Sequence, residues 1–117
     1  ELMAAIGGSL ERDEVELRRT ARAAFERGSN PAGFLRQFAA ILASGDRTQQ
    51  LVRLRGLPAL AIHGLQDPLI PPSGGRATAE ALACPFLGIE GMGHDLPPAS
   101  WTSIVEAVSG LARTATR

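Results

Sequence analysis

Internal disulfides are excluded, because the chain contains a single cysteine, Cys84. A protein without disulfides suits a reducing compartment, so we predict a cytoplasmic location. Cys84 lies between Ala83 and Pro85 with no histidine nearby, and we interpret it as a small buried thiol rather than a nucleophile. Two histidines without a cysteine cluster or an H-x-x-x-H spacing indicate no metal site.

An excess of charge of either sign is also lacking. Twelve acidic and twelve basic residues cancel, so nothing points to a nucleic-acid partner or to an anionic membrane surface. The apolar runs are far shorter than the roughly 20 residues that a membrane span needs, and we expect no membrane partner. A hydrophobic fraction of 44% is ordinary for a globular protein and argues against disorder.

A nucleophile elbow is the next absence. In a G-x-S-x-G elbow the serine has a glycine two residues before it and another two residues after it, because the strained turn needs small neighbours. Ser9 and Ser73 each have one such glycine, and none of the seven serines has both. We therefore predict that no serine of this chain is a catalytic nucleophile.

The first 45 residues predict two helices. Asp13, with Glu16 three residues later, is typical of a capping box, and this helix should end at Gly28. Asn30-Pro31 predicts the start of the second helix, with Asn as the N-cap and Pro at the first helical position, and Gly45 predicts its end. Its apolar stripe has helical spacing and consists of Phe34, Leu35, Phe38, Ile41 and Leu42.

The remaining residues predict helices that alternate with two strands. The expected elements are a short helix over 46–54, a strand over 58–63, a helix over 73–83, a strand over 86–89 and a last helix that starts near Pro98 or Ser100. The apolar stripe of that last helix comprises Trp101, Ile104, Val105, Val108 and Leu111. Continuous rather than alternating apolarity indicates strands buried on both faces of a parallel sheet, so the predicted fold class is α/β.

Asp67 and His94 each follow one of the two predicted strands. Open α/β sheets place their active sites at the carboxyl ends of parallel strands, so these side chains should share one edge of the sheet. A catalytic histidine needs one ring nitrogen for the nucleophile and the other for an orienting acid, and the glycines beside His94 allow its ring to project into a pocket. Taken singly, His94 also suits a surface loop, and Asp67-Pro68 also suits an ordinary turn.

Other polar residues near these positions receive other interpretations. His63 ends a predicted strand, and we interpret it as a structural histidine hydrogen-bonded to the backbone. Asp95 is adjacent to His94, so its side chain should point elsewhere, and Glu90 at the strand end should be a solvated charge. Met92 could line a pocket, whereas Trp101 at helical spacing predicts a core residue.

Residues 57–98 resemble the α/β-hydrolase family. Residues 57–71 (LPALAIHGLQDPLIP) resemble its strand with the triad acid, and residues 91–97 (GMGHDLP) resemble its catalytic-histidine segment. Within the family, Arg36-Gln37, residues 43–47 (ASGDR) and the GMGHDLP run resemble bacterial esterases of the aclacinomycin methylesterase type.

The resemblance implies a partial α/β-hydrolase fold, with two parallel strands, flanking helices and helices of a cap at the N-terminal side. Residues 1–45 would form the cap-like segment, and residues 46–117 the C-terminal part of the core. The intact protein would hydrolyse a small-molecule carboxylic ester without a cofactor, with His94 as general base and Asp67 as the acid that orients it. The elbow serine would lie upstream of Glu1, so the chain alone should be an inactive fragment.

Two alternatives stay open. The same fold can use an Asp nucleophile for dehalogenation or epoxide opening, and the chain could instead be a truncated, non-catalytic interaction module. An in-frame G-x-S-x-G upstream of Glu1 would favour an enzyme, and a start codon just before Glu1 would favour the module. Two strands form a poor independent sheet, so we also expect a homo-oligomer or packing against the rest of the parent protein.

Overall fold

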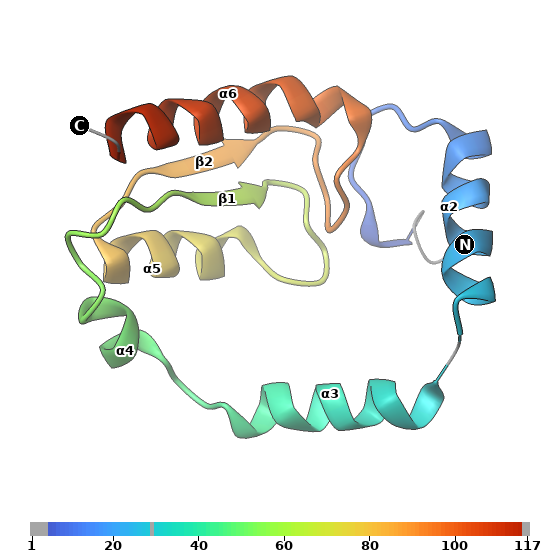
Figure 1. Ribbon diagram of the computed structural model, residues 1–117, viewed down its shortest axis with the longest axis horizontal. Coiled ribbons are helices and arrows are strands. Elements are labelled where there is room, and N and C mark those ends of the chain that lie inside the picture. Colours follow the sequence, from blue (N-terminus) through green and yellow to red (C-terminus); the bar gives the residue numbers. More distant parts are fainter. Residues whose placement is uncertain (1–4, 29, 116–117) are drawn as a thin grey trace. The chain divides into compact units, whose positions relative to one another are not determined.

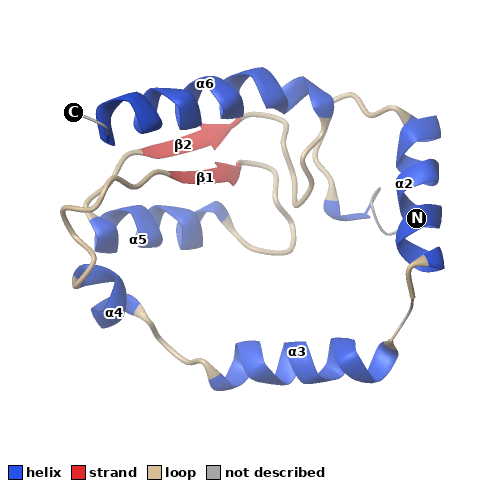
Figure 2. Cartoon of the chain, viewed as in Figure 1, coloured by secondary structure: helices blue, strands red, loops and turns tan. Residues whose placement is uncertain are grey.

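A computed structural model describes residues 5–28 and 30–115 of the chain (Figure 1). The chain divides into two compact units, one of residues 12–47 and one that joins residues 5–11 to residues 48–115. Most of the chain is helical, and the strands form one small sheet (Figure 2). The elements in chain order are α2 (Glu14–Glu26), α3 (Pro31–Ala43), α4 (Thr48–Val52), β1 (Ala61–Gly64), α5 (Pro72–Leu82), β2 (Phe86–Ile89) and α6 (Pro98–Ala115).

Both helices of the unit formed by residues 12–47 begin at side-chain caps. The Asp13 carboxylate accepts hydrogen bonds from the backbone N–H groups of Val15 and Glu16, at 2.9 and 3.0 Å. The Asn30 side chain accepts one from the N–H of Gly33 at 2.9 Å, and a proline occupies the first turn of α3. Side-chain oxygens satisfy N–H groups that have no partner within the helix, and both predicted helix starts are confirmed.

The apolar stripe of α3 is exposed within this unit, where neither α2 nor α3 has a buried residue. Phe34 and Phe38 stack on each other one turn apart, with ring centroids 6.4 Å apart. The exposed stripe (the α3 stripe) consists of Phe34, Leu35, Phe38, Ile41 and Leu42. A helix with a continuous apolar stripe is stable in water only when another surface covers that stripe, so α3 presents a surface for contact.

The sheet consists of β1 and β2, which pair in parallel with Ala61 opposite Phe86 and Gly64 opposite Ile89. The crossover helix α5 packs against both strands, and α6 runs along the other side of them (Figure 1). Strand, helix and parallel strand form the predicted βαβ unit, so the α/β class is confirmed at this level. The predicted bounds of β2 are correct, whereas β1 starts at Ala61 and not at Pro58, because a strand is limited to the length of its partner.

The strands are less buried than their apolar sequences predict. Only Gly64 and Ile89 are buried, and the other strand residues are partly exposed. In the described two-stranded sheet each strand has one edge without a neighbouring strand, so the strands are not the fully buried strands that the sequence predicts. The buried apolar residues are Ala79, Ala81, Ile89 and Met92, and they lie on α5, on β2 and in the turn after β2.

In α6, Trp101 differs from the prediction that it is a core residue. Trp101 is 56% exposed, and its indole N–H donates to the backbone carbonyl of Leu96 at 2.9 Å. Val105 and Val108 are exposed as well. Ser100, at the start of the helix, is buried, and its hydroxyl donates to the carbonyl of Pro97. None of the described helices combines the length and apolarity that a bilayer span requires.

Candidate functional site

The loop after β1 presents Asp67 from a tight turn. One carboxylate oxygen, Oδ1, accepts hydrogen bonds from the backbone N–H groups of Leu69 and Ile70, at 2.8 and 2.9 Å. Aspartate is favoured at such positions because its short side chain can bond the backbone two and three residues ahead. The side chain is 4% exposed, so the second oxygen, Oδ2, is held in a fixed direction.

His94 follows a glycine-rich turn after β2, whose conformation and close packing favour glycine. Gly91 has φ +73°, which favours glycine, and Gly91, Met92 and Gly93 are all buried. A methyl group on Gly93 would overlap backbone atoms of the segment near Ile6, and a methyl group on Gly64 would overlap the carbonyls of Met92 and Gly93. The end of β1 therefore lies close to the turn at Met92 and Gly93, because Gly64 has no side chain there.

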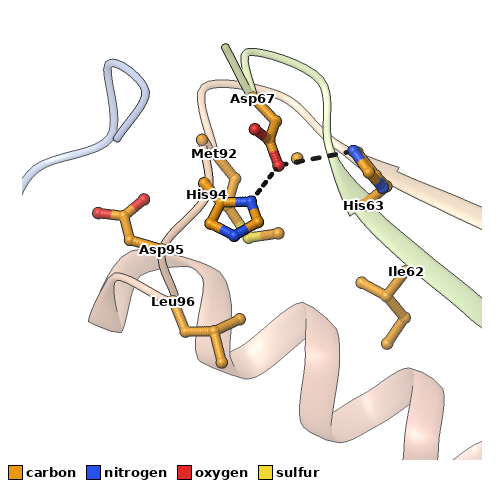
Figure 3. Close-up of a pocket in the computed structure, with 9 residues that line it drawn as sticks. Ile62, His63, Asp67, Met92, His94, Asp95 and Leu96 are labelled. Carbon is orange, nitrogen blue, oxygen red and sulfur yellow. Dashed lines mark hydrogen bonds and ion pairs between the residues drawn. The ribbon is translucent and has the colours of Figure 1, made fainter. Parts of the chain in front are cut away.

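Asp67 and His94 meet in a hydrogen bond of 2.8 Å between Oδ2 and Nδ1, although 27 positions separate them in the sequence (Figure 3). The carboxylate can only accept, so Nδ1 of His94 carries the proton and Nε2 of the neutral ring has a free lone pair. Nε2 faces away from Asp67, and it has no hydrogen-bond partner among the described residues (Figure 3). With 37% of its side chain exposed, His94 is placed to accept a proton from another molecule or segment.

Asp67 is ionised at neutral pH despite its burial. Burial by itself would raise the pKa of the carboxyl group, but the hydrogen bonds from the Ile70 amide, the His94 ring and the Leu69 amide outweigh it. Together they hold the pKa of Asp67 below its ordinary value. A buried carboxylate that stays charged can stabilise a positive charge that forms on the neighbouring imidazole.

His63 supports the loop of Asp67 from β1. Its Nε2 donates to the backbone carbonyl of Ile70 at 2.9 Å and lies 3.6 Å from Oδ2 of Asp67, which is too long for a hydrogen bond. Its ring faces Gly75 of α5, where an added methyl group would lie 2.7 Å from Nδ1. The bond to a backbone carbonyl is the one predicted for a structural histidine.

The other candidate residues lie apart from this pair. The carboxylate of Asp95 points away from the His94 ring, as its adjacent position predicts, and Glu90 is exposed (Figure 3). Cys84 is partly exposed and, like Trp101, is absent from the lining of the hollow beside His94. No serine among the described residues lines that hollow, and Ser29 lies outside the described residues.

The hollow beside His94 measures about 230 Å³ and is open to solvent. Ile62 and Leu96 give it apolar walls, and Asp67 and His94 supply its polar side (Figure 3). Its lining consists of Ile62, His63, Gly64, Asp67, Met92, Gly93, His94, Asp95 and Leu96. Among the described residues no group of His, Cys, Asp and Glu side chains could hold a metal ion. The arrangement offers a proton acceptor beside an apolar surface.

Residues 5–11 contribute to this site in a way that no motif in the sequence indicates. The backbone N–H of His94 donates to the carbonyl of Ile6 at 2.7 Å, and the N–H of Leu10 donates to the carbonyl of Gly91 at 3.0 Å. The signal that could have drawn attention to this segment is the pair Gly7-Gly8, since adjacent glycines allow backbone segments to approach closely.

Comparison with known proteins gives no family for the chain. No protein-family model matches it, and no curated protein matches it either. The likeness of residues 57–98 to α/β-hydrolases therefore rests on the residues themselves and stays a hypothesis.

Proposed function

We propose that Asp67 and His94 are the acid and the general base of an ester-hydrolysing site of the α/β-hydrolase kind. The observation that supports this most is the 2.8 Å bond between Oδ2 of Asp67 and Nδ1 of His94, formed where two adjacent parallel strands end. A histidine bonded on one side to a buried carboxylate and open on the other is what nucleophile activation requires. The resemblance of residues 57–98 to the triad segments of that family agrees with it.

In the proposed reaction Nε2 of His94 removes the proton from a nucleophilic hydroxyl as that oxygen attacks the ester carbonyl. The positive charge that forms on the ring is stabilised by Asp67 at 2.8 Å. His94 then returns the proton to the leaving alcohol as the C–O bond breaks, which leaves an acyl ester on the nucleophile. A water molecule, deprotonated by the same nitrogen, then attacks this acyl group. The bond between the acyl carbon and the nucleophile oxygen breaks, His94 returns the proton to that oxygen, and the acid leaves.

The nucleophile and the donors for the oxyanion belong to residues other than those that line the hollow. A serine is our proposal, since residues 36–37, 43–47 and 91–97 resemble those of bacterial esterases. An aspartate nucleophile, as in dehalogenation or epoxide opening, would use the same base and the same orienting acid to activate water. The reading frame upstream of Glu1 separates the two possibilities.

The test is hydrolysis of p-nitrophenyl butyrate by the product of the complete reading frame. We expect His94→Ala to lower kcat about 100- to 10,000-fold, the usual contribution of a positioned base, and Glu90→Gln to leave it unchanged. Glu90 is the control because it is exposed and does not line the hollow. Wild-type turnover by His94→Ala would refute the proposal. The 117-residue chain by itself should show no turnover above its own His94→Ala variant.

A second candidate function is a non-catalytic interaction module. The observation that favours it is the α3 stripe, which is exposed within its own unit. Under this alternative the complete reading frame gives no His94-dependent hydrolysis, and replacement of α3 stripe residues abolishes a complex that His94→Ala leaves intact.

A further inference from the structure

Residues 6–10 contact both of the loops that carry the Asp67–His94 pair (Figure 1). On the histidine loop the carbonyl of Ile6 accepts from the N–H of His94 at 2.7 Å, and the N–H of Leu10 donates to Gly91 at 3.0 Å. On the acid loop the N–H of Ser9 donates to Oε1 of Gln66 at 2.9 Å. Three hydrogen bonds thus tie one short segment to the residue before Asp67, to His94 itself and to the turn in front of it.

The packing of this segment leaves no room for side chains at its centre. A methyl group on Gly8 would overlap the carbonyl of Gly91 and lie 2.8 Å from the backbone nitrogen of Gly93. Conversely, a methyl group on Gly93 would overlap backbone atoms of Gly8. Both sides of this contact are backbone atoms, which cannot move aside as the end of a flexible side chain can. The close approach of the two backbones therefore requires glycine at positions 8 and 93.

Besides the Asp67–His94 bond, a backbone hydrogen bond joins the two loops directly. The N–H of Gln66 donates to the carbonyl of Met92 at 2.9 Å, which ties the loops where they leave the strands. The reacting side chains lie further along, at positions 67 and 94. The bond between Gln66 and Met92 does not reach these positions, whereas the carbonyl of Ile6 accepts a hydrogen bond from the backbone N–H of His94 itself.

We propose that residues 6–10 form a clamp that sets the distance between the Asp67 carboxylate and the His94 imidazole, with Gly8 as its critical positioning residue. The effect of the clamp on catalysis rests on the proposed function, whereas the contacts that form the clamp do not depend on it. Residues 6–10 do not line the hollow beside His94, so the role that we assign to the clamp is to position His94 rather than to take part in proton transfer.

The test uses NMR of the 117-residue chain, with two readouts. The first is the Nδ1–H resonance of His94, which is protected from solvent exchange while the bond to Asp67 is formed. The second is hydrogen exchange at the backbone N–H groups of His94 and Leu10. We expect Gly8→Ala to abolish the Nδ1–H resonance and to accelerate both exchange rates by at least about tenfold, because their acceptors are released. Gly110→Ala is the matched control, since a methyl group there meets no atom closer than 3.9 Å.

A second variant covers the case in which Gly8→Ala does not fold. Gln66 is exposed, and Gln66→Leu removes only the acceptor for the Ser9 N–H. We expect faster exchange at Ser9 and a weaker Nδ1–H resonance of His94, and we expect Gln66→Glu, which keeps an oxygen at that position, to restore both. If Gly8→Ala folds and both of its signals are as in wild type, the clamp proposal is overturned. If Gly8→Ala does not fold, wild-type signals in Gln66→Leu overturn it.

Failure of the clamp and failure of the proposed function give different results. If His94 is not a catalytic base, the ester assay of the complete reading frame loses its dependence on His94, while the NMR signals still respond to Gly8→Ala. If the clamp is wrong, the NMR signals do not respond, whatever the ester assay shows.

Discussion

The two carboxylate oxygens of Asp67 serve different partners. Oδ1 accepts from the amides of Leu69 and Ile70 and so fixes the turn of its own loop, while Oδ2 accepts from His94. A carboxylate can accept four hydrogen bonds, so the side chain can hold its own loop and the neighbouring ring together. The longer side chain of glutamate would displace one of these two interactions.

Asp67→Asn separates the two tasks of this residue. The amide oxygen can still accept from the Leu69 and Ile70 amides, so we expect the fold to be kept. The amide NH₂ group facing His94 would donate to Nδ1, which moves the ring proton to Nε2 and removes the lone pair that, in the proposed reaction, accepts the proton of the nucleophile. In the esterase assay of the complete reading frame we expect kcat to fall about 10,000-fold, as in triads whose histidine is held in the wrong tautomer.

Glu90→Gln is the control for this substitution, because Glu90 is an exposed acid at the end of β2. Equal losses from the two substitutions would mean that overall charge, rather than the bond to His94, supports activity.

Asp67 also makes the stability of the chain depend on pH. Its pKa in the folded chain is lower than the ordinary value of 3.8. A carboxyl group of this kind contributes stability that is complete above the unfolded pKa and is lost as the pH falls through the folded pKa. We expect the free energy of unfolding of wild type relative to Asp67→Asn to fall as the pH drops below about 4, in urea melts at each pH. A difference that stays constant down to pH 2 would contradict the low pKa.

That Asp67 and His94 follow two strands and lie at one edge of the sheet could be predicted from the sequence, whereas the atoms through which they bond could not. Asp67 and His94 each follow a short apolar run, and the parallel pairing of those runs brings both to one edge of the sheet. Which oxygen of Asp67 meets which nitrogen depends on the turns at Leu69-Ile70 and at Gly91–Gly93. Those turn conformations arise from contacts between segments distant in sequence, which residue patterns do not encode.

At the scale of elements, local signals predicted the structure well where the interaction itself is local. The caps at Asp13 and Asn30 act within three residues, and α2 and α3 start where they indicate. The start of β1 and the exposure of Trp101 were predicted wrongly. The pairing length of a strand and the burial of a helix face depend on neighbouring elements, so apolar runs alone cannot determine them.

Adjacent glycines in α5 provide a matched pair for testing how this helix packs. A methyl group on Gly74 has its nearest contact at 3.7 Å, which is ordinary packing, whereas one on Gly75 would lie 2.7 Å from the His63 ring and 3.0 Å from the Phe86 ring. We expect Gly74→Ala to stabilise the chain by about 0.5–1 kcal/mol through lower chain entropy in the unfolded state. Gly75→Ala should destabilise it by about 1–3 kcal/mol through overpacking.

Urea unfolding of the two variants at neutral pH measures both effects. Because His63 is anchored to the carbonyl of Ile70, its ring cannot move away without a loss of that bond. A Gly75→Ala variant as stable as Gly74→Ala would show that α5 does not pack closely on β1.

At the scale of the whole molecule, Asp67 and His94 are held by hydrogen bonds, whereas the apolar stripes of α3 and α6 are largely exposed. The segment 5–11 joins the sheet unit across more than 80 residues of sequence, through the bond between Ile6 and His94. Contacts between residues so far apart in the sequence leave no periodic pattern. The sequence therefore shows the glycines at positions 8 and 93 but does not indicate that they are in contact. By contrast, the apolar stripes of α3 and α6 follow directly from the helical spacing in the sequence, although their exposure does not.

These exposed stripes, together with zero net charge, predict self-association of the 117-residue chain. Apolar area removed from water is the main favourable contribution to association, and a chain without net charge has no overall repulsion between copies. We expect the weight-average mass in light scattering to rise above that of a 12.3 kDa monomer as concentration increases.

Phe38→Glu tests whether α3 is responsible, because Phe38 lies in the middle of the α3 stripe and is 52% exposed, so the fold should tolerate the change. Ala40→Glu adds the same charge on the opposite side of the helix, since two residues span about 200° of helical rotation. We expect Phe38→Glu to lower the mass toward the monomer and Ala40→Glu to leave it as in wild type. Equal effects would assign the change to charge alone, and a monodisperse wild-type monomer with one cooperative melt would show that the exposed stripes do not drive association. If only Phe38→Glu dissociates the chain, burial of the α3 stripe is what holds the copies together.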